Sequence, residues 1–305
     1  MRAMSTARSE PWAFKAARRT RRTFLKATAG LLSAAGSLNR GGAAPLRPPA
    51  RSIRWLVFYG ERTDEAALAT YDIVVLDPGF QGAISSVAGA GTRVCSYLSL
   101  GEIKSSDPFF DFIDRAALLE ENPDWPGTRR VDVRHPSWHS LIFDRKIPSI
   151  AAKGFNGLML DTLDTAPYLE QVDPGRYDGM RAAAIGLVAT IRTRWPGMML
   201  IMNRGYALLP DLVDKIDAVM AESLVTSPDA RTGGFAWVDQ QRVELELSLL
   251  TPAARRSPPL PILSLDYWFP DDSKTIAAIY RRERDLGHHP YVATRLLDRI
   301  IPEVH

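Results

Sequence analysis

Eight short apolar segments recur along the chain after residue 52, and longer segments of mixed polarity separate them. Each has four to six residues rich in Val, Ile, Leu, Met or aromatic side chains. We identify them at Trp55–Tyr59, Ile73–Leu76, Val94–Leu98, Gly157–Leu160, Met199–Met202, Ala218–Ala221, Ile262–Leu265 and Tyr291–Thr294. Continuous apolar runs of this length are typical of parallel strands that are buried on both faces.

The segments between these runs carry helical periodicity. Apolar side chains recur every three or four residues from Met180 to Trp195, and Pro196–Gly197 ends the pattern. Ser273 can cap a later helix that Gly287 terminates. Strands and helices alternate over about 255 residues, which predicts an α/β fold: a single-domain (β/α)8 TIM barrel. A doubly wound sheet is the alternative, but no Gly-rich phosphate loop follows the first strand.

Polar and aromatic side chains stand at or just beyond the carboxyl ends of the runs. We expect the following to bind substrate: Tyr59, Asp77, Tyr97, Ser99, Glu102, Asn203, Asp266, Tyr267 and Trp268. The loops at this end of a barrel build the active site in essentially every characterised barrel enzyme. A single Asp at a strand end is more often a helix N-cap, so the convergence of several carboxylates on one mouth is the informative feature.

A mouth lined by carboxylates and aromatic rings is suited to cleaving glycosidic bonds. One carboxylate attacks the sugar or assists the attack, and another protonates the leaving oxygen. The rings of Tyr59, Tyr97, Tyr267 and Trp268 are suited either to stacking on sugar faces or to packing at the rim of the barrel.

The charge of the chain is divided between a basic N-terminus and an acidic body. The whole chain has a net charge of +3, but residues 1–44 hold nine basic side chains and one acidic. The remainder therefore has 29 basic and 34 acidic side chains, a net charge of −5. An acidic body argues against nucleic acid as a partner and favours a cationic one.

The basic N-terminus has the pattern of an export signal. Arg21–Arg22 and Phe24–Lys26 precede an uncharged segment, Ala27–Leu38, and resemble a twin-arginine signal. That segment has about 12 residues, whereas a bilayer-spanning helix needs about 20, so we expect no stable membrane anchor. A disordered basic tail is the alternative. We therefore predict a leader at 1–44 that engages the export machinery, a Pro-rich tether at 45–51, a barrel at 52–305, and a periplasmic or secreted protein.

Cys95 is the single cysteine, so the chain forms no intrachain disulfide. It lies within an apolar run, where we expect a buried and unreactive thiol. A protein without disulfides fits the twin-arginine route, which carries proteins that have already folded in the reducing cytoplasm.

Four strings resemble glycoside hydrolase family 114, the endo-α-1,4-polygalactosaminidases. They are Tyr97–Glu102, Gly154–Asp164, Ala221–Ser223 and Leu265–Tyr267, and the resemblance extends from about Trp55 to Ile300. The Gly-Phe-x-Gly-x-x-x-Asp-x-x-Asp string is the most specific part. Asn156 departs from the Asp that is common there, but it precedes the strand, so we expect little effect on chemistry.

The resemblance implies a barrel that cleaves α-1,4-linked galactosamine polymers with retention of configuration and without a cofactor. It implies Asp161 as nucleophile and Glu222 as general acid/base, and Asp164 is an alternative nucleophile. One strand separates their two strands, which is compatible with the roughly 5–5.5 Å carboxyl spacing of retaining enzymes. Crowded carboxylates should raise one carboxyl pKa, for which Glu222 is the better placed. A polymer with free amines is cationic and suits such a groove.

Two other hypotheses compete with this one. A non-catalytic sugar-binding barrel would keep the groove without turnover, although both candidate catalytic carboxylates are present. A metal-dependent polysaccharide deacetylase is suggested by His135, His139 and Asp271–Asp272. In that class the Asp pair precedes the His pair within a Thr-Phe-Asp-Asp-Gly string, which this sequence lacks, so we expect no metal.

Overall fold

We describe the protein from a computed structural model, and the description covers residues 52–303. The predicted leader, at 1–44, and the predicted tether, at 45–51, lie outside the described residues.

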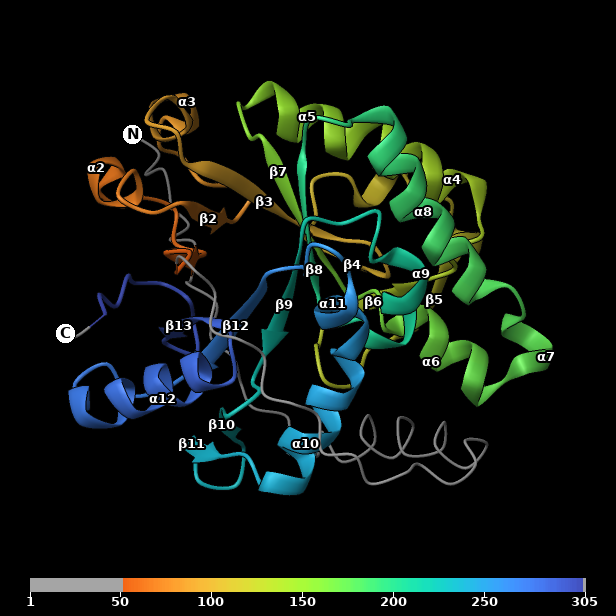
Figure 1. The fold of residues 1–305 in the computed structure, drawn as a ribbon. Helices are drawn as coiled ribbons and strands as arrows, with labels where there is room; N and C mark the ends of the chain where they lie inside the picture. The colour runs from red at the N-terminus through yellow and green to blue at the C-terminus, as the bar shows by residue number, and fades with distance from the viewer. Residues whose placement is uncertain (1–51, 304–305) are drawn as a thin grey trace, which may run out of the picture.

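The core of the described chain is a ring of eight parallel strands with helices around it (Figure 1). In spatial order the strands are β1 (Trp55–Phe58), β2 (Ile73–Leu76), β3 (Arg93–Ser99), β7 (Gly157–Asp161), β8 (Met199–Asn203), β9 (Ala218–Glu222), β12 (Ile262–Tyr267) and β13 (His289–Ala293). The first and last strands are in contact, and the Trp55 indole N–H donates to the His289 carbonyl at 2.7 Å. The (β/α)8 barrel is confirmed, and each predicted strand matches an observed one to within two residues at either end.

Helices occupy most of the connections between strands. They are α2 (Glu65–Leu68), α3 (Ile84–Gly89), α4 (Pro136–Ser140), the π-helical η4 (Leu141–Lys146), α5 (Ile147–Ala152), α6 (Thr165–Val172), α7 (Pro174–Tyr177), α8 (Met180–Arg194), α9 (Leu209–Leu212), α10 (Gln240–Leu249), α11 (Thr251–Arg255) and α12 (Ser273–Asp285), with 3-10 turns η2 (Phe110–Phe112), η3 (Arg115–Ala117) and η5 (Tyr206–Leu208). The two predicted helices are α8 and α12. Asp272, not Ser273, caps α12, because its carboxylate accepts from the Thr275 N–H at the positive end of the helix dipole.

Two inserts extend the connections that leave the carboxyl ends of strands. The first, between β3 and β7, is a three-stranded antiparallel sheet of β4 (Glu102–Lys104), β6 (Thr128–Val131) and β5 (Leu118–Glu121). The second, after β9, is a hairpin of β10 (Thr226–Asp229) and β11 (Gly234–Trp237). In Figure 1 this hairpin lies beyond the arrowhead of β9, on the side toward which that strand runs.

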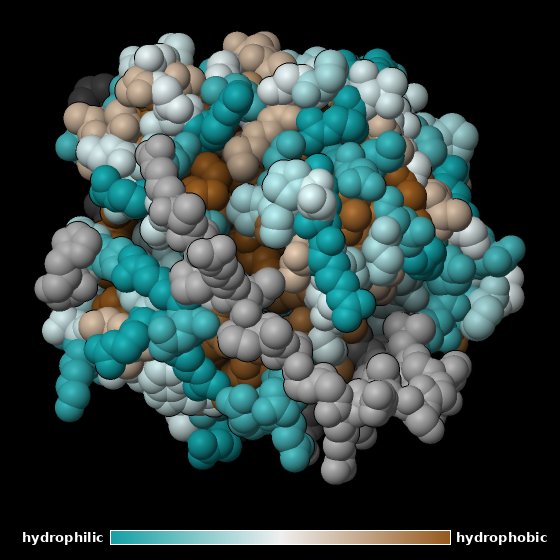
Figure 2. All heavy atoms as spheres, in the orientation of Figure 1, coloured by the Kyte–Doolittle hydropathy of each residue, from teal (hydrophilic) through white to brown (hydrophobic). Residues whose placement is uncertain are grey.

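The apolar runs are buried as their composition predicts. Every residue of β1, β2, β12 and β13 is buried. On the face shown in Figure 2, hydrophilic residues cover most of the surface, and hydrophobic residues are visible between them. The predicted burial of Cys95 is confirmed, and burial raises the pKa of its thiol to about 12. None of the helices within residues 52–303 is long and apolar enough to cross a membrane.

Strand β7 packs closely between its neighbours at its first residue. A Cβ on Gly157 would lie 2.4 Å from the sulfur of Cys95 and 3.0 Å from the Met199 carbonyl oxygen. The sulfur belongs to β3 and the carbonyl to β8, so a side chain here would push both neighbouring strands away.

We therefore expect Gly157→Ala to lower the free energy of unfolding by about 2–3 kcal/mol, as overpacking does in a close-packed core. Gly186→Ala is the matched control, because Gly186 is an exposed residue of α8 and its added Cβ meets nothing within 4 Å. That substitution should raise stability by about 0.5–1 kcal/mol through helix propensity. Urea unfolding of both variants measures the difference, and equal stabilities would contradict the close packing at β7.

Candidate active site

Three adjacent strands, β7, β8 and β9, end in Asp161, Asn203 and Glu222. The Asn203 side-chain amide donates one hydrogen bond to Asp161 Oδ1 at 2.9 Å and another to Glu222 Oε2 at 3.0 Å. Both oxygens accept from the same nitrogen, so the distance between them cannot exceed the sum of the two hydrogen-bond lengths, about 5.9 Å. Retaining glycosidases hold their carboxyl groups about 5–5.5 Å apart, and inverting ones about 6.5–9.5 Å apart.

The backbone turns sharply after each of these three residues. Thr162, Arg204 and Ser223, the residues that follow them, have φ values of 59°, 52° and 60°. This left-handed region is costly for residues other than glycine, and strained backbone of this kind is concentrated at functional sites. Hydrogen bonds from neighbouring segments hold the turns, as when the Ser223 N–H donates to the Leu265 carbonyl at 2.8 Å.

Asp161 has the electrostatics of a crowded carboxyl group. Burial and the nearby charge of Glu222 together raise its pKa to about 6, against the opposing effect of the Asn203 hydrogen bond. We expected crowding to raise one carboxyl pKa, and the pKa values of Asp161 and Asp164 are both raised. The charge of Glu222 contributes to the rise at each.

Tyrosines from three further strands surround the pair. The Tyr267 hydroxyl donates to Glu222 Oε1 at 2.8 Å, and the Tyr97 hydroxyl hydrogen-bonds to Asp161. The Tyr59 and Tyr97 rings contact edge to face, with centroids 5.7 Å apart. Burial, followed by the charge of Asp161, raises the pKa of both hydroxyl groups, so they remain neutral donors beside the carboxylates.

Arg204 is the main site residue absent from our predicted set. Its guanidinium donates to the Glu222 carbonyl at 2.8 Å and pairs with the buried carboxylate of Glu246 at 3.5 Å. Arg242 approaches the same Glu246 oxygen at 3.2 Å. Arg204 thus fixes the backbone that carries Glu222. Its position directly after Asn203 was the only sequence signal available.

Asp164 lies at the edge of the pair, at the N-terminus of α6. Burial raises the pKa of its carboxyl, and the charge of Arg204 lowers it. Both hydrogens of the Asn203 amide go to Asp161 and Glu222, so the bridge does not include Asp164.

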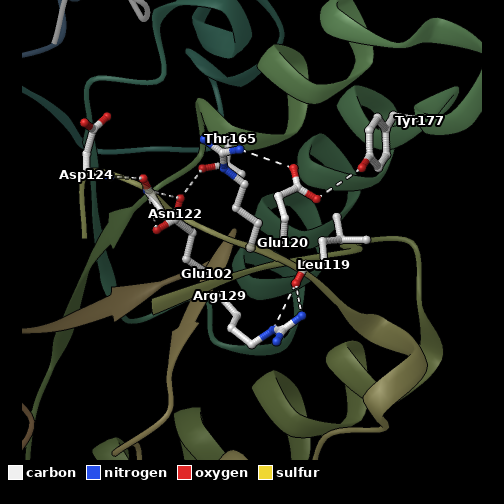
Figure 3. A network of polar contacts seen from close by, with 9 residues as sticks. Glu102, Leu119, Glu120, Asn122, Asp124, Arg129, Thr165 and Tyr177 are labelled. Carbon is white, nitrogen blue, oxygen red and sulfur yellow. Dashed lines mark hydrogen bonds and ion pairs between the residues drawn. The ribbon is translucent and has the colours of Figure 1, made fainter. Parts of the chain in front are cut away.

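Two of the predicted polar residues after β3 are engaged by other parts of the protein. Glu102 is 4% exposed and accepts hydrogen bonds from Asn122 at 2.9 and 3.1 Å and from Thr165 at 3.0 Å. Figure 3 shows Asn122 and Thr165 converging on this carboxylate. The Ser99 hydroxyl donates to the Glu102 carbonyl at 2.7 Å. These contacts join the three-stranded insert to the start of α6.

Asp266 is likewise fully buried, at 0% exposure. Its Oδ1 accepts from the Val225 N–H at 3.1 Å, the Thr226 N–H at 2.7 Å and the Thr226 hydroxyl at 3.2 Å. Burial, together with the charge of Glu283, holds the pKa of Asp266 well above its usual range. The contacts fasten the base of the β10–β11 hairpin to β12.

The two remaining predicted residues lie near the surface of the mouth. Asp77 accepts from the Gly79 N–H at 2.6 Å and is close enough to Tyr59 for its charge to act on that hydroxyl. The Trp268 indole N–H donates to Asp272 at 3.0 Å, and its ring packs against the core.

The histidines of the deacetylase hypothesis have local partners. His135 caps α4 and contacts the Ser137 hydroxyl at 2.8 Å, and His139 contacts the Val133 carbonyl at 2.8 Å. Within the described part of the chain, no group of three or more His, Cys, Asp or Glu residues is arranged to hold a metal ion.

Comparisons with known proteins agree with this architecture. The chain is similar to the glycoside hydrolase domain of PelA from Pseudomonas aeruginosa, with 27% identity over 83% of this chain and 99% of that one, and a TM-score of 0.71. It shares the fold of Ega3 from Aspergillus fumigatus, solved in complex with galactosamine, at 16% identity over 86% of this chain and 99% of that one, and a TM-score of 0.60.

A relative in Deinococcus radiodurans, an uncharacterized protein, is 26% identical over 275 residues, which are 84% of this chain and 86% of the relative. The model of glycoside-hydrolase family GH114 matches residues 37–304. The match includes every strand of the barrel and all three residues of the Asp161–Asn203–Glu222 bridge. The protein therefore belongs to glycoside-hydrolase family GH114 and is a glycoside hydrolase.

Proposed function

We propose that the protein cleaves internal α-1,4 bonds of a galactosamine-containing polysaccharide, partially deacetylated polygalactosamine, by a retaining two-carboxylate mechanism. The observation that carries the mechanism is the Asn203 bridge, which holds Asp161 and Glu222 within about 5.9 Å at the mouth of the barrel. That spacing leaves room for a sugar carbon between the carboxyl groups but not for the additional water of an inverting enzyme.

In the first step, a carboxylate oxygen of Asp161 attacks the anomeric carbon. The glycosidic C–O bond breaks, and the leaving oxygen takes its electron pair together with the proton of Glu222. In the second step, water attacks the same carbon, gives its proton to Glu222, and displaces Asp161. Asn203 and Tyr97 orient Asp161, and Tyr267 orients Glu222.

The pair must hold one proton for this reaction. Burial and mutual repulsion raise the pKa of Asp161 to about 6, which favours one proton on the pair below that pH. The proposed roles require that proton on Glu222 once a sugar lies between the two groups. In the reverse assignment, Glu222 attacks the anomeric carbon and Asp161 protonates the leaving oxygen. An experiment with an activated leaving group, described below, distinguishes the two assignments.

The substrate class rests on relatives and on charge. The similar domain of PelA is a glycoside hydrolase domain, and Ega3 was solved in complex with galactosamine. Amino sugars with free amines are cationic near neutral pH. The body of this chain has a net charge of −5 outside residues 1–44, and the mouth holds Asp161, Asp164, Glu222 and Asp77. Arg204 and Lys104 lie near these carboxylates, and the remaining excess of negative charge would attract a cationic polymer and speed its association.

We expect Asp161→Asn and Glu222→Gln each to reduce release of new reducing ends from partially deacetylated polygalactosamine by about 10³-fold or more. Both should leave the fold intact, because amide and carboxylate have nearly the same shape, and circular dichroism tests this. Asp271→Asn, an exposed change outside the pair, is the control. Wild-type protein that binds the polymer but releases no ends would contradict the proposed activity and support a sugar-binding barrel.

The two roles predict different responses to the leaving group. With an aryl α-galactosaminide, whose phenolate departs without protonation, Glu222→Gln should regain most of the lost rate, and azide should add to it in place of activated water. Asp161→Asn should regain little, because it lacks the attacking group. If the activated substrate restored the rate of Asp161→Asn but not that of Glu222→Gln, Glu222 would be the nucleophile and Asp161 the general acid/base.

The raised pKa of Asp161 also predicts a dependence of stability on pH. Its carboxyl titrates at about 6 when folded, against an ordinary value of 3.8, so the folded state binds the proton more tightly. The contribution of this proton to the stability of the folded state is fully present below about pH 4 and is lost as the pH rises through 6. Asp161→Asn should therefore be more stable than wild type by about 1–3 kcal/mol at pH 8, and equal to it near pH 3.5. Denaturant unfolding at both values measures this, and a constant difference would contradict the shift.

We propose export through the leader at residues 1–44, and therefore a periplasmic or secreted enzyme. Arg21→Lys together with Arg22→Lys preserves charge but removes the guanidinium pair of a twin-arginine signal. In a bacterium with that pathway, we expect the full chain to stay in the cytoplasm, as measured by fractionation. The neighbouring pair, Arg18→Lys with Arg19→Lys, is the matched control and should be exported normally. Equal export of both double variants would refute the signal.

A further inference from the structure

A cluster of four aromatic rings lies where the β10–β11 hairpin meets the end of β12. Phe235 contacts Trp268 and Phe269 with centroids 6.0 and 4.9 Å apart. Trp268 contacts Trp237 and Phe269, both at 6.0 Å. We call these four residues, Phe235, Trp237, Trp268 and Phe269, the aromatic platform.

The platform is more exposed than packing of the hairpin requires. Phe235 and Trp268 are half-buried against the core, which is enough to hold the hairpin on the barrel. Trp237 and Phe269 are 43% and 50% exposed. Large rings that stay in contact with water do not contribute the free energy of burial that aromatic side chains can supply. Contiguous exposed apolar residues commonly mark a binding surface.

Polar contacts hold the rings in defined orientations. The Trp268 indole N–H is fixed by Asp272, which itself caps α12. The Arg282 guanidinium lies 5.6 Å from the Trp237 ring centroid and is anchored by Gln240 at 2.9 Å. Arg282 therefore lies over one face of Trp237 and helps to fix the orientation of the ring.

The platform stands on two segments that leave the same end of the barrel as the Asp161–Glu222 pair. Trp268 directly follows Tyr267, whose hydroxyl donates to Glu222 at 2.8 Å. The hairpin begins four residues after Glu222, and Asp266 fastens its first residue, Thr226, to β12. The rings therefore lie at the carboxyl-end face of the barrel, the face that carries the two carboxylates.

We propose that the aromatic platform is a distal subsite that stacks on sugar rings of the bound polysaccharide, several units from the cleaved bond. The pyranose C–H face packs on Trp237 and Phe269, and protonated amines lie against ring faces and near the carboxylate of Asp229. Asp229 lies opposite Gly234 in the hairpin register, and a Cβ on Gly234 would come within 3.1 Å of the Phe269 ring. This inference rests on the proposed function, because it concerns the same substrate.

The test compares long and short substrates. We expect the double variant Trp237→Ala/Phe269→Ala to lower kcat/KM on long partially deacetylated polygalactosamine by about tenfold or more, with KM rising. On the shortest oligosaccharide that wild type cleaves, which does not reach the platform, the fall should be several times smaller. Phe112→Ala is the matched control, since its ring is 53% exposed but lies under Arg145 of η4, at 4.0 Å. It should not change the ratio of the two rates.

The outcomes separate this inference from the proposed function. If the double variant cleaves the long polymer as wild type does, or loses activity equally on long and short substrates, the platform is not a distal subsite. If wild type releases no reducing ends, the proposed activity fails, and retention on a gel containing the polymer decides the platform. Weaker retention of the double variant than of wild type and Phe112→Ala supports the subsite, and equal retention or none overturns it.

Discussion

The arrangement depends on one amide that lies between two carboxylates. At no more than about 5.9 Å, two full negative charges repel each other by on the order of 3 kcal/mol or more at an effective dielectric constant of about 20. Asn203 offers one hydrogen to each carboxylate, so it offsets part of this repulsion and fixes their spacing. It can do so because β8 lies between β7 and β9, and because the parallel strands bring all three side chains to one end of the barrel.

Holding such a pair in a folded protein is costly, and the surrounding structure shows where stability is given up. Three left-handed residues follow the three strand ends, and Asp161 keeps a raised pKa because its charge is poorly solvated. The barrel below the site compensates with strands that are buried along their length. Active sites commonly exchange stability for function in this way, which explains why removing the charge at Asp161 should stabilise the protein.

The barrel and the Asp161–Glu222 pair were predicted from the sequence for different reasons. Parallel strands that are buried on both faces are continuous apolar runs, so the number of strands and their order along the chain could be predicted from these runs. Asp161 and Glu222 were found by their place after such runs and by a family resemblance. Glu102 and Asp266 occupy similar places in the sequence, yet they are 4% and 0% exposed. Glu102 and Asp266 are buried because residues of the inserts contact them, and position at a strand end carries no information about such contacts.

The carboxylates of the mouth therefore divide by task. Asp161 and Glu222 are bridged by Asn203, while two others are buried and fasten the inserts, Glu102 through Thr165 and Asp266 through Thr226. A buried carboxylate with several N–H or O–H donors makes strong, directional contacts, which add to the apolar packing of the first insert through Ile103 and Val131. The barrel thus carries the Asp161–Asn203–Glu222 bridge, and acids at or just after the ends of its strands hold the two inserts beside that bridge.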